Sequence, residues 1–434
     1  MVGVCETERS LALPPASAIP YRVLVCASGM SPAIITETLY ALITRPLPSE
    51  PFVPDEIHIV TTTEGQKRIA KDLLQPGGPF EQLLAAYLPS GCTRPRFDAT
   101  TIHVISGQAD VNSEHSNKLA GDCMFHTYLS IQNGSLLKRG AGRGAPHIHA
   151  SIAGGRKTMS FLMGHVFSLL AGPNDELSHV LVNEPFEAVR PTFFFPPQQP
   201  VMHVHTPRGL GGASAQGAVE ISSDQARIEL GLITALKLGN QWMPSAWSDG
   251  SATHMSFELA VRLANAQHTP EPITLMLAQD SLDLKTRSYM SVCGQEIDLG
   301  VSEFALLAMY ALVKQNAHRC PSGEALDITA LPAGLWDLLP NEFGDNRKKF
   351  SAFSADKFKT SRTRLDAALQ RHIGSAASHY LIAPIGDKAA GTHRPYQLVT
   401  PANLIEFGGD SAFLGWDSEW WPILRRHLLQ IPSV

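Results

Sequence analysis

Short apolar runs alternate with longer amphipathic segments along the first half of the chain. Uninterrupted apolar runs predict buried strands, whereas apolar positions that recur every three or four residues predict helices. The strands predicted in this way are Arg22–Ala27, Glu56–Thr62, Thr101–Ser106, His147–Ile152 and His179–Val182. The helices predicted between them are Ile34–Leu42, Glu64–Leu74, Ser116–Ile131 and Arg156–Leu170. Such alternation is typical of a parallel sheet covered on both faces, so residues 21–208 are expected to form a Rossmann-like, doubly wound α/β domain.

The pattern changes at both ends of this domain. Residues 1–20 are rich in Pro and Ala and show no periodicity, so we expect a flexible leader. Residues 209–280 begin with a Gly-, Ala- and Ser-rich stretch and are expected to form a connecting region, to which the sequence assigns no role.

The C-terminal part, residues 281–434, combines helices with a hairpin. Helices are expected from the cap residue Ser302 to Val313, over Phe350–Phe358 and over Ser361–Ile373. Two short apolar runs, Tyr380–Ile385 and Tyr396–Val399, then flank a polar loop. Helices followed by a hairpin predict a winged helix-turn-helix domain.

Two turns rich in small residues enter helices at the same predicted edge of the sheet. The first turn contains Ser28, Gly29, Met30 and Ser31, and Ser31 is the expected N-cap of the next helix, with Pro32 as its first residue. The second turn, with the residues that begin its helix, contains Ala153, Gly154, Gly155, Arg156, Lys157 and Thr158. Ligands of open α/β sheets bind beyond the C-terminal ends of the strands, so the two turns are expected to form one pocket.

The second turn has the chemistry of a polyanion site. Glycines at positions 154 and 155 let backbone N–H groups approach an anion, and Arg156 and Lys157 supply positive charge. Neither the Walker A spacing nor the G-x-G-x-x-G dinucleotide pattern is present at these turns. The alternative is a tight strand-to-helix turn that carries two solvated cations.

Charge and composition limit the class of protein. The chain has 35 Lys and Arg against 40 Asp and Glu, a net charge of −5, so binding of anions has to come from local basic clusters. No apolar stretch is long enough to span a membrane and no signal peptide is evident, so a cytoplasmic protein without a membrane partner is expected. The six cysteines lack C-x-x-C spacing and the paired histidines lack companion ligands, so we expect neither a metal nor a cofactor.

The motifs resemble those of a known family. The segment from Cys26 to Leu42 and the segment from Ser151 to Met159 resemble the two ligand motifs of CARF domains, and Leu181–Glu187 and Phe193–Pro197 are similar to a type III CRISPR accessory family described as ring nucleases. The resemblance covers residues 21–200 and, more loosely, the winged-helix region.

This resemblance implies a homodimer that binds a cyclic oligoadenylate, most often the tetramer, on its two-fold axis. It implies ligand contacts from Asp110 and from both turns. Ring cleavage needs no metal if a ribose 2′-hydroxyl attacks the neighbouring phosphate in line. Lys157 is then expected to stabilise the reacting phosphate and Ser28 to position the hydroxyl, and His149 lies close enough in sequence to be considered as a base.

A second basic cluster lies near the C-terminus. Eight Lys and Arg residues occur from Arg347 to Arg371, against two Asp. The residues expected to contact duplex DNA are Lys357, Lys359, Arg362, Arg364 and Arg371. The alternative is a solvated basic helix in a dimerisation module.

Two functions therefore remain open. The chain is either a ring nuclease that ends type III antiviral signalling, or a transcriptional regulator that senses the ring without significant cleavage.

Overall fold

The computed structural model describes residues 20–46, 50–139, 143–189, 193–205, 219–248, 255–279, 286–319, 323–327, 355–385 and 395–409. The expected leader, apart from residue 20, and the basic residues Arg347, Lys348 and Lys349 lie outside the described residues. The chain divides into two compact units, Met1–Gly239 and Asn240–Val434. The expected connecting region is thus shared between them.

The first unit is built on a six-stranded, mostly parallel sheet. Its strands, in spatial order, are β3 (Ile102–Val104), β2 (Glu56–Thr61), β1 (Tyr21–Ser28), β4 (Pro146–Ser151), β5 (Glu176–Val182) and β8 (Ile228–Leu232). The first five strands run parallel, whereas β8 pairs antiparallel with β5. The expected parallel-sheet core is therefore confirmed, and the antiparallel edge strand was not predicted.

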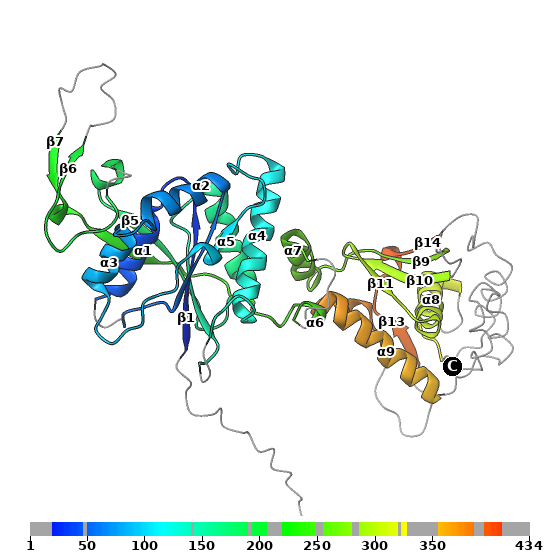
Figure 1. The fold of residues 1–434 in the computed structure, drawn as a ribbon. Coiled ribbons are helices and arrows are strands. Elements are labelled where there is room, and N and C mark those ends of the chain that lie inside the picture. The colour runs from blue at the N-terminus through cyan, green and yellow to red at the C-terminus, as the bar shows by residue number, and fades with distance from the viewer. Residues whose placement is uncertain are drawn as a thin grey trace, which may run out of the picture. The chain divides into compact units, whose positions relative to one another are not determined.

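Helices cover both faces of this sheet (Figure 1). They are α1 (Ala33–Ile43), α2 (Thr63–Arg68), α3 (Pro79–Tyr87), α4 (Glu114–Gln132) and α5 (Lys157–Leu170). Helices α1 and α3 lie on one face, and α4 and α5 lie together on the other. This arrangement leaves the carboxyl ends of the strands open to a ligand.

The predicted cap of α1 was wrong. The helix begins at Ala33, and its cap position is Pro32, which makes no side-chain hydrogen bond to the helix. The proline ring already fixes the backbone angle needed at the helix entrance, with φ of −71°. Ser31 is consequently one residue too early to act as the cap.

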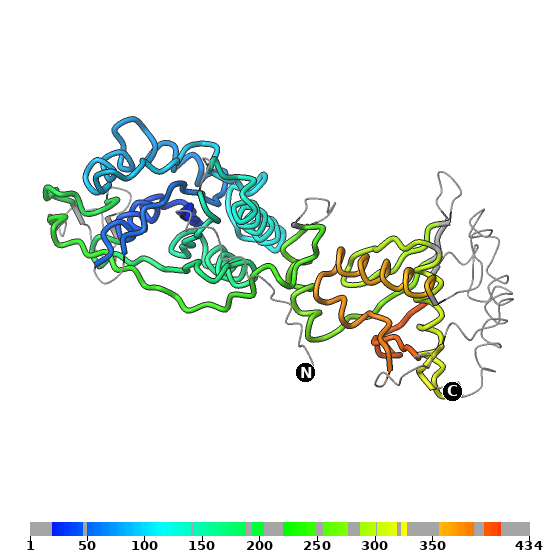
Figure 2. Tube along the Cα trace, turned by 90° about the horizontal axis from the view of Figure 1, so that it is seen from below, coloured from blue at the N-terminus to red at the C-terminus, as the bar shows by residue number. Residues whose placement is uncertain are grey.

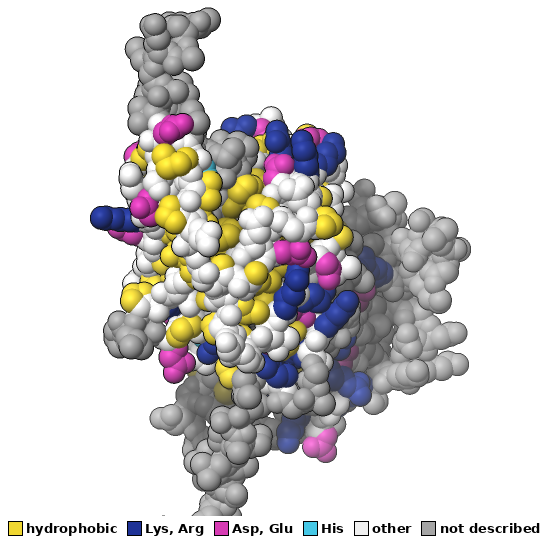
Figure 3. Space-filling view, turned by 60° about the vertical axis from the view of Figure 1, so that its left-hand side comes forward, with side chains coloured by type: hydrophobic (Ala, Val, Ile, Leu, Met, Phe, Trp, Pro, Cys, Tyr) yellow, Lys and Arg dark blue, Asp and Glu magenta, His cyan; other side chains and the backbone are white. Residues whose placement is uncertain are grey.

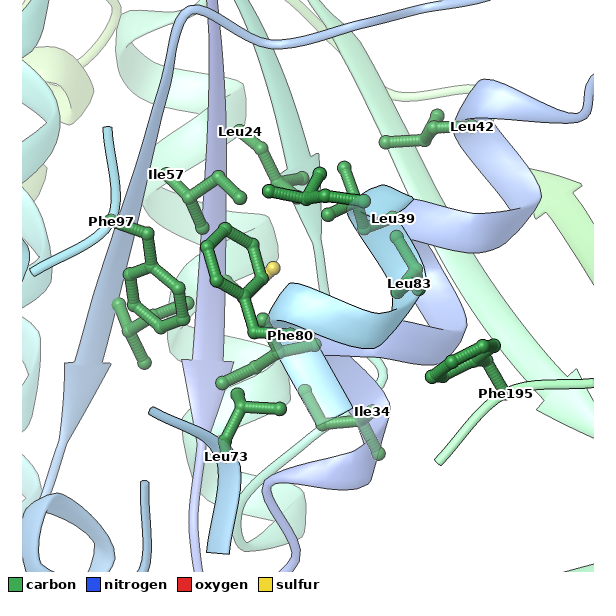
Figure 4. Packing of buried hydrophobic residues seen from close by; sticks show 14 of the residues in the cluster. Leu24, Ile34, Leu39, Leu42, Ile57, Leu73, Phe80, Leu83, Phe97 and Phe195 are labelled. Carbon is green, nitrogen blue, oxygen red and sulfur yellow. The ribbon is translucent and has the colours of Figure 1, made fainter. Parts of the chain in front are cut away.

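Apolar side chains fill both faces of the sheet. Leu24 points toward α1 and α3, where it packs with Phe80 and Leu83 (Figure 4), and Cys26 belongs to the same buried cluster. Val25, which alternates with them along β1, is equally buried on the opposite face. Helix α3 was not predicted, although Pro79 at its first turn and apolar residues three apart are the signals of such a helix.

The β5–β8 end of the sheet exposes apolar side chains. Leu181 on β5 and Leu232 on β8 are more than half exposed. A separate hairpin of β6 (Met202–His205) and β7 (Val219–Ser222) also belongs to this unit. Figure 3 shows the side of the molecule that carries β6 and β7, with apolar side chains exposed among polar ones.

The second unit combines a four-stranded sheet with helices. The sheet contains, in spatial order, β11 (Gln295–Asp298), β10 (Thr286–Val292), β9 (Ile273–Gln279) and β14 (Ile405–Gly409). The helices are α6 (Ser245–Ser248), α7 (Phe257–Ala266), α8 (Val301–Gln315) and α9 (Ala355–Ile373). Helix α9 packs against α8 and β11 (Figure 2).

Helix α9 differs from the expectation of two helices. A single helix runs from Ala355 to Ile373. Its buried apolar side chains have helical spacing and form one stripe: Phe358, Leu365, Leu369 and Ile373. Residues 350–354 of the expected first helix lie outside the described part of the chain. A short hairpin of β12 (Ile382–Pro384) and β13 (Tyr396–Leu398) follows.

Among the helices that the structure describes, none combines the length and apolarity required to cross a membrane.

Candidate functional site

A pocket of about 490 Å³ lies at the carboxyl edge of the parallel sheet. It is lined by turns that follow β1, β2, β3 and β4. The lining residues that the motifs indicated are Gly29, Met30, Ser31, Asp110, Ala153, Gly154, Gly155 and Arg156. The lining residues that they did not indicate are Ile34, Thr62, Glu64, Ala109 and Met159. The structure thus brings the two glycine-containing turns together, as expected.

The two turns touch through their backbones. A Cβ atom added to Gly29 would lie 3.1 Å from the Cα atom of Gly155, and one added to Gly154 would lie 2.5 Å from the carbonyl oxygen of Ala27. Gly155 also has a φ of 83°, a backbone angle that residues other than glycine rarely adopt. Gly154 and Gly155 therefore require glycine, Gly29 leaves little room for a Cβ atom, and the close approach leaves backbone groups at the pocket surface.

The β2–α2 turn supplies a polar wall that the sequence motifs did not reveal. The Thr62 side chain accepts a hydrogen bond from the Gly65 N–H at 3.1 Å and so caps α2. Glu64 lines the pocket and receives a hydrogen bond from Lys67 at 2.6 Å. The position of Thr62 directly after a parallel strand was the available signal.

Arg156, the cation of the pocket, is already paired. Its Nε donates to Asp110 Oδ1 at 3.0 Å, and its second contact joins Nη2 to Asp110 Oδ2. The hydrogen bond from Arg156 lowers the pKa of Asp110, and the same bond raises the pKa of Arg156. Both groups are therefore charged at neutral pH.

Three predicted site residues lie outside the pocket lining. Ser28 is fully buried at the end of β1, and its Oγ has no hydrogen-bond partner among the described residues. Lys157 and Thr158 are exposed on the first turn of α5, directly after Arg156. The lysine is thus next to the pocket in the chain, while Ser28 directly precedes Gly29, which lines the pocket.

His149 is enclosed and does not line the pocket. Its Nε2 lies 2.7 Å from Ser178 Oγ, and its Nδ1 lies 3.1 Å from Glu176 Oε2. Burial lowers the pKa of His149, which the contact with Glu176 partly opposes. The three side chains have the order of a hydrolase triad, but His149 and Ser178 are fully buried, so the arrangement stabilises the sheet. No group of three or more potential metal ligands is present within the described ranges.

The basic residues of α9 differ in their surroundings. Lys359, Arg364 and Arg371 are exposed, and Lys357 is partly buried. Arg362 instead packs 5.1 Å above the ring of Tyr396, and its Nη1 donates to the carbonyl oxygen of Ile382 at 3.4 Å. Arg362 therefore holds the β12–β13 hairpin against the helix.

Comparison with known proteins relates part of the chain to a family model. No curated protein matches the chain in sequence. Residues 31–215, which include most of the pocket lining, match the family model described as CRISPR-associated protein NE0113, so over this segment the chain is similar to a CRISPR-associated family.

Proposed function

We propose that this chain binds a cyclic oligoadenylate, with cyclic tetra-adenylate as the preferred ring, and cleaves it. The observation that carries the proposal is the backbone contact between the Gly29 and Gly155 turns at a pocket that also holds Arg156. Backbone N–H groups and an arginine are the usual partners of phosphate. The similarity of residues 31–215 to a CRISPR-associated family supports a nucleotide signal of that system as the ligand.

A second copy of the chain would complete the site. A cavity of about 490 Å³ is in the range for a single drug-sized ligand and is small for a ring of four nucleotides. A symmetric ring suits a two-fold axis, on which each copy contacts half of the ligand. Met30, which lines the pocket and is 56% exposed, and Phe161 of α5, which is 70% exposed, provide apolar surface for such a contact.

The proposed cleavage is an internal transfer within the ring. The ribose 2′-oxygen forms a bond to the adjacent phosphorus, the bond from phosphorus to the 5′-oxygen breaks, and the proton of the 2′-hydroxyl ends on that 5′-oxygen. The product is a linear chain with a 2′,3′-cyclic phosphate. Lys157 stabilises the charge of the pentacoordinate phosphate. The role expected for Ser28, positioning of the 2′-hydroxyl, is not carried into this proposal, because its Oγ is fully buried outside the pocket lining.

The test is incubation of the purified protein with labelled cyclic tetra-adenylate in the presence of EDTA. We expect linear products with a 2′,3′-cyclic phosphate end, and calorimetric titration should give one ring per two chains. An intact ring after prolonged incubation would contradict the cleavage, and a ratio of one ring per chain would contradict the shared site.

Ligand-controlled DNA binding is the second candidate function. Its supporting observation is helix α9, on which Lys359 and Arg364 are exposed beside the β12–β13 hairpin that Arg362 contacts. A helix with an exposed basic side next to a hairpin is the arrangement that a winged helix presents to DNA phosphates.

Substitution of Arg364 by alanine tests this candidate. The Arg364 side chain is 72% exposed and has only a weak contact, at 4.0 Å, with Glu303, so its loss should barely affect folding. We expect weaker binding of duplex DNA from the protein's own locus, with the slope of log K against log salt reduced by about one. Arg227→Ala, which removes an exposed arginine of the first unit, is the control. Unchanged affinity and slope would argue against α9 as the DNA contact.

A further inference from the structure

Asp110 and Arg156 come from turns that are not neighbours in the sheet. Asp110 follows β3 and Arg156 follows β4, and β2 and β1 lie between these two strands. At about 4.8 Å per strand, the pair connects turns whose strands are about 14 Å apart. The ion pair therefore crosses the ends of β1 and β2, above the pocket residues that those strands carry.

The two partners differ in how firmly the structure holds them. The loop of Asp110 is tied to the start of α2, because the Thr63 N–H and hydroxyl both donate to the Gln108 carbonyl oxygen, at 2.9 and 3.1 Å. The Asp110 carboxylate also accepts a hydrogen bond from the Val111 N–H at 2.8 Å. Arg156, by contrast, has a long side chain that is 62% exposed. If the pair opens, the guanidinium is the part that moves.

The charges of the pocket lining do not favour an anion while Arg156 is paired with Asp110. The lining contains two carboxylates, Glu64 and Asp110, and one guanidinium, which Asp110 already occupies with both oxygens. A phosphate uses the same two-pronged geometry toward arginine as a carboxylate does. Phosphate and Asp110 therefore compete for the same N–H groups of Arg156.

We propose that Asp110 is an internal competitor of the ligand phosphate: its carboxylate holds Arg156 across the pocket and releases it when a phosphate takes its place. This inference rests on the proposed binding of a phosphate-containing ring and names the residue that regulates access to it. Replacing Asp110 by a phosphate on Arg156 costs little free energy, because an exposed ion pair contributes little to stability. Binding is then favoured by ligands that offer a phosphate to Arg156 and also contact the glycine turns beneath.

Asp110→Asn tests the competition. The amide keeps the shape of the side chain but removes its charge, so we expect the full-length variant to bind cyclic tetra-adenylate about two- to fivefold more tightly than the parent. This gain in affinity should vanish when Arg156 is also replaced by glutamine, because residue 110 then has no guanidinium to pair with. Asp224→Asn, which makes the same change at an exposed position outside the pocket lining, should leave the affinity unchanged.

Titration of the same proteins with inorganic pyrophosphate separates this inference from the proposed function. Tighter pyrophosphate binding by Asp110→Asn in a protein that takes no ring would support the competition and contradict the ring as ligand. Ring binding with equal or lower affinity in Asp110→Asn would overturn the competition and leave the proposed function intact. If neither probe binds any of the variants, both proposals are wrong.

Discussion

Substitution of Lys157 by alanine is expected to slow ring cleavage by about 100- to 1000-fold while the protein still binds the ring. Lys157 is the first residue of α5 and follows Arg156 directly, so its ammonium group is available next to the pocket. Charge on the phosphate increases as the 2′-oxygen attacks, and a cation that acts mainly at that stage lowers the barrier more than it strengthens binding.

Single-turnover rates with enzyme in excess, measured beside dissociation constants, separate the two effects. Lys71→Ala removes another exposed lysine of the same unit and serves as the control. A Lys157→Ala protein that binds and cleaves at the parental rate would remove the lysine from the mechanism. Loss of binding with an unchanged rate at saturation would assign it to ligand capture instead.

Substitution of Glu56 by alanine is expected to lower the free energy of unfolding by about 3–5 kcal/mol. The carboxylate is fully buried at the start of β2 and accepts hydrogen bonds from Tyr21 Oη at 2.7 Å and from the Lys138 N–H at 2.8 Å. It also contacts His58 Nε2 at 2.9 Å and forms an ion pair with Arg96. Alanine leaves these donors buried without their shared acceptor.

Glu56→Gln separates the charge from the packing. Burial by itself raises the pKa of Glu56, but hydrogen bonds from His58, Arg96 and Tyr21 outweigh it and hold the pKa at about 2. Because the folded-state pKa lies below the unfolded value of 4.5, the stabilisation is complete above that value and is lost as the pH falls toward 2. The glutamine variant should lack this part of the acid dependence.

Urea unfolding followed by circular dichroism between pH 7 and pH 3 measures both effects. Glu187→Ala, at an exposed position of the same unit, should unfold like the parent. If Glu56→Ala unfolds at the parental urea concentration at pH 7, the buried carboxylate is not a structural requirement of the sheet.

The sheet and its ligand edge could be predicted because their signals are local. The buried strand β1 contains the uninterrupted apolar run Val23–Ala27, and α5 begins at Lys157, separated only by Arg156 from the Gly154–Gly155 pair. Backbone contact and positive φ at these positions demand glycine, so the residue type alone marked the turn. Parallel strands then bring the two turns to one edge without further information.

Contacts between distant segments could not be predicted in the same way. Asp110 and Arg156 are 46 residues apart, and only the strand order brings them together across the pocket. The burial of Ser28 and the contact of Arg362 with Tyr396 likewise depend on which neighbour each side chain meets. Hydrophobic periodicity carries no information about such pairs.

The sequence by itself determined the alternation of strands and helices, the glycine turns and the basic helix, because backbone propensity and residue chemistry act over a few positions. The tertiary structure decided that Arg156 is held by Asp110. It also decided that His149 is enclosed by Glu176 and Ser178, and that β8 joins the sheet as an antiparallel edge strand. The physical reason is that charge pairing and burial depend on distance in space, which the strand order sets.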